Sequence, residues 1–137
     1  MHLLGIDADE EEIELLNSKD VKDKFIPMVL EANNGRGKLY ITQDPACSSL
    51  YPPDEDLILI RPTSSVTNLA NIQEVEISTL DDWKRTKGIA NIDFMKLAVQ
   101  EAELDVLQGA EKFLESVRML EVEVEFTPIY SRGISFW

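Results

Sequence analysis

The segment from Ile92 to Tyr130 constrains the fold of this chain more than any other part of it. An apolar stretch, Ile92 to Val99, precedes a helical pattern from Ala102 to Val117, and an alternating run from Leu120 to Phe126 follows. Apolar residues at every third or fourth position predict a helix, and strict alternation predicts a strand. A strand, a helix and a second strand in this order are typical of the crossover unit that joins parallel strands. We therefore expect an α/β fold with a mostly parallel sheet and flanking helices.

The first part of the chain continues this alternation. Leu3 to Ile6 predicts a short strand, and the acidic residues that follow it are favourable in the first turn of a helix. Phe25 to Leu30 predicts a second strand. The Asn33-Asn34-Gly35 turn then predicts a hairpin that leads into a strand from Lys38 to Thr42.

Proline marks the middle of the chain as a long loop from Asp44 to Asp56. Beyond it, Leu57 to Ile60 is apolar and β-prone, and Glu74 to Ile77 alternates as a strand does. Thr79 is placed to cap a short helix that begins after it.

The net charge of −13 over 137 residues excludes several classes of partner. Such a field repels nucleic acid and anionic lipid surfaces, so we expect neither as a partner. No apolar run reaches the length of a membrane span, and the chain turns acidic within its first residues, unlike a secretory leader. We expect a cytoplasmic protein with a single domain over residues 1–137.

Two features that could carry chemistry also have plainer readings. Cys47 is the only cysteine, so the chain has no CxxC motif, and an ordinary loop cysteine is favoured over a reactive thiol. Glu121, Glu123 and Glu125 lie about 7 Å apart along one face of a strand. Carboxylates so spaced favour a solvated or cleft-facing surface over a metal site, and Glu125 is the best functional candidate because it lies nearest the strand's carboxyl end.

Ligands of open α/β sheets bind beyond the carboxyl ends of the strands. Asp7 follows the first predicted strand, where an acid is either a ligand-binding group or a helix cap. Asp9 is placed to supply that cap, which leaves Asp7 for a ligand. Gln100 and Glu103 lie at the junction of the later strand and helix, and Glu103 has the same alternative reading as a capping acid.

The same region resembles the FkbM-type family of S-adenosylmethionine-dependent methyltransferases, whose pattern there is roughly DFxKxDxQGxExxVLxGA. The matching positions are Asp93, Phe94, Lys96, Gln100, Glu103, Val106, Leu107, Gly109 and Ala110. Ala98 stands where the family has an acid, and Glu101 stands where it has glycine. The likeness extends over most of the chain, from about Leu3 to Phe136.

The resemblance implies S-adenosylmethionine as cofactor and a hydroxyl of a small molecule or sugar as methyl acceptor. It places Asp7 on the ribose of the cofactor. The family often has a second acid at the position of Ala32, and Glu31, one residue earlier, is the candidate for that cofactor-binding role. The resemblance makes Gln100 and Glu103 catalytic candidates, in addition to Glu125. Lys96 is either a surface lysine or the partner of a nearby acid, and the family pattern favours the partner. Tyr130 would form a wall of the substrate pocket.

Two parts of the family's pattern have no counterpart in this sequence. The glycines form no glycine-rich cofactor loop, and the chain ends before the family's last strands. We therefore expect an incomplete, Rossmann-like class I methyltransferase fold that lacks its first and last strands. Unpaired inner strands would either re-pair or drive self-association. The competing hypothesis is a non-catalytic remnant that acts as a binding or oligomerising module.

Overall fold

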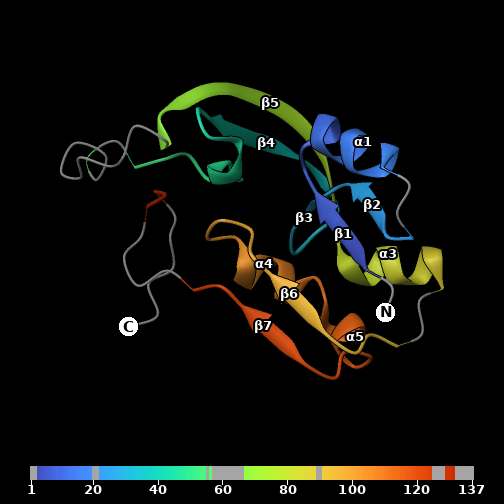
Figure 1. Ribbon diagram of the computed structural model, residues 1–137. Helices are drawn as coiled ribbons and strands as arrows, with labels where there is room; N and C mark the ends of the chain where they lie inside the picture. Colours follow the sequence, from blue (N-terminus) through green and yellow to red (C-terminus); the bar gives the residue numbers. More distant parts are fainter. Residues whose placement is uncertain are drawn as a thin grey trace.

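A computed structural model describes residues 3–19, 22–54, 56, 67–88, 91–124 and 129–131 (Figure 1). The strands are β1 (Leu4–Asp7), β2 (Lys24–Pro27), β3 (Val29–Leu30), β4 (Gly35–Thr42), β5 (Leu69–Ser78), β6 (Met95–Leu97) and β7 (Leu120–Val122). The helices are α1 (Glu10–Ser18), α3 (Leu80–Lys87), α4 (Glu103–Gln108) and α5 (Glu111–Leu114), with a 3₁₀ turn at Pro45–Cys47. The predicted strand from Leu57 to Ile60 lies outside the described residues.

The α/β class is confirmed, while the mostly parallel sheet is confirmed only in part. β1 pairs with β2, β6 with β7 and β3 with β5, all in parallel, but β4 runs antiparallel to β5. Among the described strands these pairings form three separate sheets rather than one.

The predicted hairpin between the second and third strands is wrong. β5 lies between β3 and β4, so the strands that flank the Asn33-Asn34-Gly35 turn never pair with each other. The turn bonds to the end of β5 instead, because Asn34 Oδ1 accepts the N–H of Thr79 at 2.9 Å and the N–H of Glu31 donates to Ser78 O at 3.1 Å. β5 is the longest of the described strands, and it pairs with β4 from Gly35–Ile77 to Thr42–Leu69. It therefore offers β4 a more extensive partner than the two-residue β3 does.

The predicted helix from Ala102 to Val117 is broken at Gly109 and Ala110 into α4 and α5. A Cβ at Gly109 would lie 2.3 Å from the backbone oxygen of Glu31, so this corner packs against the chain directly after β3. Asp81 of α3 stabilises the break, since its carboxylate accepts the N–H groups of Lys112 at 3.1 Å and Phe113 at 2.7 Å. The corner therefore satisfies the N–H groups that the start of α5 would otherwise leave without partners.

The two predicted helix caps are confirmed. Asp9 Oδ1 accepts the N–H of Glu12 at 3.0 Å at the start of α1. Thr79 Oγ1 accepts the N–H of Asp82 at 3.1 Å at the start of α3, which ends at Gly88 with a left-handed φ of 67°. Both caps could be predicted because each depends on residues three positions apart.

One hydrophobic core joins the strands to the helical layer. Its buried members are Leu80, Trp83, Leu97, Val106, Ala110 and Phe113. Ile6 of β1 and Ile26 of β2 pack against the same cluster as Met95 of β6. The β1–β2 and β6–β7 pairs thus lie on one shared layer of helices (Figure 1). None of the described helices is long and apolar enough to span a membrane.

Substitution of Gly109 tests the corner. Gly109→Ala should lower the free energy of unfolding by about 3 kcal/mol, because the new methyl group meets rigid backbone rather than a flexible side chain. Urea denaturation followed by tryptophan fluorescence measures the change. The matched control is Gly35→Ala, whose Cβ meets nothing within 4 Å and should shift stability by no more than about 0.5 kcal/mol. Equal stabilities of the two variants would contradict the close contact.

Candidate functional site

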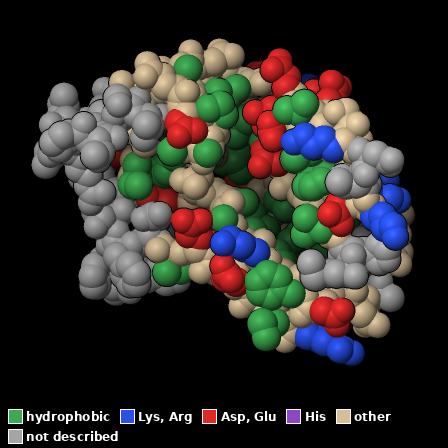
Figure 2. All heavy atoms as spheres, viewed as in Figure 1, with side chains coloured by type: hydrophobic (Ala, Val, Ile, Leu, Met, Phe, Trp, Pro, Cys, Tyr) green, Lys and Arg blue, Asp and Glu red, His purple; other side chains and the backbone are tan. Residues whose placement is uncertain are grey.

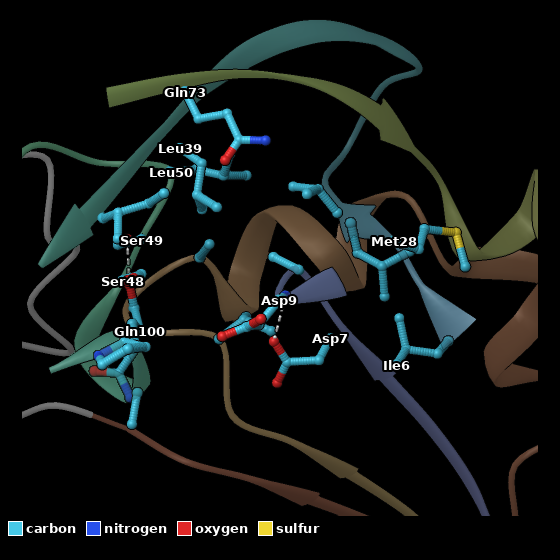
Figure 3. Close-up of a pocket in the computed structure, with 18 of the residues that line it drawn as sticks. Ile6, Asp7, Asp9, Met28, Leu39, Ser48, Ser49, Leu50, Gln73 and Gln100 are labelled. Atoms are coloured by element: carbon cyan, nitrogen blue, oxygen red, sulfur yellow. Dashed lines mark hydrogen bonds between the residues drawn. The ribbon is translucent and has the colours of Figure 1, made fainter. Parts of the chain in front are cut away.

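A hollow of about 440 Å³ lies beyond the carboxyl ends of β1, β2 and β6 and alongside β3, with residues of β4 and β5 also in its lining. Figure 2 shows it as a depression in the face of the molecule, with hydrophobic side chains inside it and acidic side chains on its rim. Figure 3 shows the residues that line it. Its size and position are those of small-molecule sites in α/β folds.

One side of the hollow is acidic. Asp7 ends β1, and Asp9, Glu10 and Glu11 begin α1; all four line the hollow. Asp7 Oδ1 accepts the N–H of Asp9 at 2.9 Å, which fixes the turn between strand and helix (Figure 3). Asp9 is the helix cap, as predicted, so Asp7 combines a turn-forming bond with a place on the hollow.

The remaining walls are apolar with a few amides and hydroxyls. Met28, Val29 and Leu30 form one wall at the end of β2 and along β3. Leu39, Ile41 and Leu50 also line the hollow, and Figure 3 shows Leu39 and Leu50 across it from Met28. Polar groups come from Ser48, Gln73 and Gln100, each from a different segment. Apolar walls with a small number of placed polar groups are the usual lining of a site for a small organic molecule.

The turn after β6 is strained. Gln100 and Glu101 have φ values of 53° and 71°, the left-handed region that favours glycine. Side chains hold the turn in place: the Ser49 hydroxyl donates to Gln100 O at 2.7 Å, and Glu101 Oε1 accepts the N–H of Ile129. Glycine at position 101 in the family pattern is thus explained by the backbone conformation. The Glu101 carboxylate reaches the segment around Ile129 and does not line the hollow.

The other predicted site residues lie around the hollow rather than on it. Glu103 is 8% exposed, and its Oε1 accepts the N–H of Val99 at 2.8 Å, so it ties the end of β6 to the start of α4. Glu31 follows β3, with its backbone against Gly109, and is not among the lining residues. Of the predicted residues, Asp7 and Gln100 are brought together at the hollow. Glu125 lies outside the described residues.

Tyr130 is buried beside the loop that contributes to the hollow and does not line the hollow itself. It is 2% exposed and packs with Tyr51 and Ala102, and its hydroxyl donates to the carbonyl oxygen of Cys47. It therefore positions the loop that carries Ser48. Burial, with the nearby Asp44 carboxylate, raises the pKa of the Cys47 thiol, which fits an ordinary loop cysteine rather than a nucleophile.

The predicted pairing of Lys96 is confirmed on the exposed face of the β6–β7 pair. Its ammonium lies 2.9 Å from Glu121 Oε1. The hydrogen bond with Glu121, with the attraction of that carboxylate and of Glu123, raises the pKa of Lys96. Both side chains are more than half exposed, so the pair contributes little to stability. In the part of the chain that is described, no group of histidine, cysteine and acidic residues is arranged to hold a metal ion.

Ser48, Gln73 and the Leu39–Ile41 wall were not predicted from the sequence. Leu39 and Gln73 are direct partners in the β4–β5 register. Leu39 and Gln73 are 34 positions apart in the sequence, and they come together at the hollow only because β4 pairs with β5 in this register. No local sequence pattern specifies that register.

Short parallel strand pairs, a shared helical layer and a hollow at the strand ends define an α/β domain, and α/β domains commonly bind ligands at that position. The family model described as the methyltransferase FkbM domain matches residues 2–136. The chain therefore belongs to the FkbM methyltransferase family. No curated protein and no solved structure matches it.

The Ser49 hydroxyl provides a test of how the site is held. It is 2% exposed, donates to Gln100 O and accepts the N–H of Tyr51 at 3.2 Å. Ser49→Ala leaves both backbone groups without this partner, so it should lower the free energy of unfolding by about 2 kcal/mol. Ser131→Ala, at an exposed serine that also bonds a backbone carbonyl, is the control and should cost about 0.5 kcal/mol or less. Chemical denaturation of both variants makes the comparison, and a smaller loss for Ser49→Ala would contradict this role.

Proposed function

We propose that the hollow binds S-adenosylmethionine and that the chain serves methyl transfer to a hydroxyl of a small molecule or sugar. The observation that carries the proposal is the place of Asp7, at the carboxyl end of β1 on the edge of the hollow (Figure 3). Membership of the FkbM family supports the same reaction class. When bound, the cofactor would supply an electrophilic methyl group on a positively charged sulfur.

The described residues fit the adenosyl half of this cofactor. A carboxylate accepts hydrogen bonds from ribose hydroxyls, and Asp7 has a second oxygen besides the one that bonds Asp9 N–H. Met28, Val29 and Leu30 offer the apolar surface that a base requires. Fit to the methionine half is weaker, because none of the described glycines lines the hollow. Gly5 lies under the Phe25 ring, and Gly37 lies under Ile77.

Gln100 is the residue that we propose to orient the acceptor. It lies at the end of β6, in the strained turn, on the edge of the hollow. An amide there can hold a hydroxyl in line for attack, which is most of what methyl transfer requires of a protein. Ala98 also lines the hollow and has no group to take the hydroxyl's proton, so we propose that the proton leaves to solvent through the open side.

The proposal gives different roles to the three predicted glutamates, Glu103, Glu31 and Glu125. Glu103 acts as a positioning residue, since its bond to Val99 N–H sets the start of the turn that carries Gln100. Glu31 supports the floor of the hollow through its backbone contact with Gly109. Glu125 stays a prediction from the sequence.

A binding or oligomerising module is the second candidate. It is favoured by the two separate parallel pairs: among the described strands, β1 pairs only with β2 and β6 only with β7. Two-stranded sheets are marginal alone, and parallel sheets are normally continuous and covered. We propose that the chain self-associates through these open edges, near which Leu4 and Phe94 are exposed.

Calorimetric titration with S-adenosylhomocysteine tests the cofactor proposal. We expect binding in the micromolar range, weakened about tenfold by Asp7→Asn, because the amide keeps one acceptor but loses the charge and the second acceptor. Asp23→Asn is the matched control: Asp23 also accepts a backbone N–H, from Leu3 at 3.0 Å, but does not line the hollow. Absence of heat, or an equal effect of the two variants, would contradict the proposal.

Light scattering tests the self-association. The chain should scatter with at least twice its mass of 15.5 kDa. Leu4→Lys should return it to a monomer, because a charge on an edge strand opposes strand addition. The control is Leu15→Lys, an exposed leucine on α1, which should leave the mass unchanged. A monomeric mass at all protein concentrations would contradict this second candidate function.

A further inference from the structure

Tyr51 is hydrogen-bonded at both ends of the strained turn that carries Gln100. Its backbone N–H donates to Ser49 Oγ at 3.2 Å, and the same Ser49 hydroxyl donates to Gln100 O at 2.7 Å. At its other end, the Tyr51 hydroxyl donates to the carboxylate of Asp105, in the first turn of α4. Tyr51 therefore spans the turn from Gln100 to Asp105.

The middle of the same turn packs against the tyrosine ring. Tyr51 is 6% exposed and Ala102 is 1% exposed, and both belong to one buried cluster with Tyr130. A buried tyrosine needs a partner for its hydroxyl. Asp105 supplies a charged acceptor, which forms the stronger class of hydrogen bond.

The backbone of this turn needs such restraint. Gln100 and Glu101 have φ values of 53° and 71°. Residues other than glycine stay in this region only where the surrounding structure imposes it. The direction of the Cα–Cβ bond depends on the backbone conformation, so a relaxed turn would direct the Gln100 amide away from the hollow that it lines.

Tyr51 also joins the turn to a second segment of the hollow's lining. Ser48 and Leu50, on either side of Ser49, both line the hollow. Figure 3 shows Ser48 and Gln100 at the same end of the hollow, away from Met28. That end is thus built from two segments that the hydrogen bonds of Ser49 and Tyr51 hold together.

We propose that Tyr51 and Asp105 are positioning residues of this site. Their hydrogen bond keeps the strained turn in place and so holds the Gln100 amide toward the acceptor. Both act through Gln100, since neither of them lines the hollow. The inference rests on the proposed function, in which Gln100 orients the hydroxyl of the acceptor.

Glutamine labelled with ¹⁵N gives a test without ligand. The chain has four glutamines, Gln43, Gln73, Gln100 and Gln108, and a Gln100→Asn variant identifies the side-chain amide signal of Gln100. Tyr51→Phe should move that signal toward the position of a free glutamine amide and leave the signals of Gln43 and Gln108 in place. Hydrogen exchange of residues 98–108 should become about tenfold faster, because loss of a charged hydrogen bond shifts the local opening equilibrium.

Matched variants assign the effect to the bond between Tyr51 and Asp105. Tyr40→Phe removes a hydroxyl from a half-buried tyrosine of β4 that does not line the hollow, and it should leave the Gln100 signal unchanged. Asp105→Asn keeps an oxygen acceptor, so it should have a smaller effect than Asp105→Ala. Tyr51→Phe combined with Asp105→Ala should have no more effect than the larger of the two single changes, because both remove the same bond.

Calorimetry with S-adenosylhomocysteine connects this test to the proposed function. The affinity for this ligand should change by no more than about twofold in Tyr51→Phe, because the proposed cofactor-binding residues, Asp7 and Met28, belong to other segments. Saturating ligand should shift the Gln100 signal in the unchanged chain. It should not do so in Tyr51→Phe, where the amide no longer points into the hollow.

Each outcome has a distinct meaning. The inference is overturned if Tyr51→Phe leaves the Gln100 signal in place, or if Tyr40→Phe has an equal effect. It also fails if Tyr51→Phe abolishes the binding of S-adenosylhomocysteine, since Tyr51 would then support the whole hollow. If Tyr51→Phe does not fold, the two Asp105 variants decide in its place. If the unchanged chain binds no S-adenosylhomocysteine, the proposed function fails, and the inference is decided by the spectra without ligand.

Discussion

The backbone contact between Gly109 and Glu31 couples the two halves of this fold. It brings the corner between α4 and α5 against the chain just after β3. The two backbones are so close that a Cβ on residue 109 would lie 2.3 Å from the backbone oxygen of Glu31. Asp81 of α3 bonds the same corner through the N–H groups of Lys112 and Phe113. Three segments distant in sequence are thus fixed relative to one another. The wall of the hollow at Leu30 and the turn at Gln100 keep their positions because the helices between them are anchored here.

The strained turn after β6 shows a second constraint. Two successive residues in the left-handed region cost on the order of 1–2 kcal/mol each, and Glu101 has no glycine-like freedom to reduce that cost. The bonds from Ser49 to Gln100 O and from Ile129 N–H to Glu101 offset it. Glu101 departs from the family pattern, and it has a structural role in this chain. Its carboxylate accepts the N–H of Ile129 and so connects that residue to the turn after β6.

The parts of the fold that could be predicted depend on neighbours in sequence. The caps at Asp9 and Thr79 and the strand that ends at Asp7 follow from patterns a few residues long. Pairing of β4 with β5 could not be predicted, because the Asn33-Asn34-Gly35 signal specifies a turn and not the strand that pairs beyond it. The break at Gly109 was missed for a related reason: apolar periodicity continues through it, and only a contact with Glu31 requires it. At the site, Asp7 and Gln100 were predicted from strand ends, whereas Gln73 depends on the unpredicted register.

In the function that we propose, binding and catalysis would depend on different segments of this chain. The binding side consists of β1, the start of α1 and β3, where Asp7 is held by a bond within its own turn. The catalytic side is the turn after β6, where Ala98 supplies no carboxylate and Glu103 is occupied by Val99 N–H. The two sides share one hydrophobic core, in which Ile6 and Leu30 pack against the same cluster as Val99. A core substitution therefore affects both sides, whereas a change of a polar side chain at the hollow acts on one of them. Under this proposal, the absence of a carboxylate at Ala98 would affect turnover without removing the binding groups at Asp7, because the two positions lie on different segments.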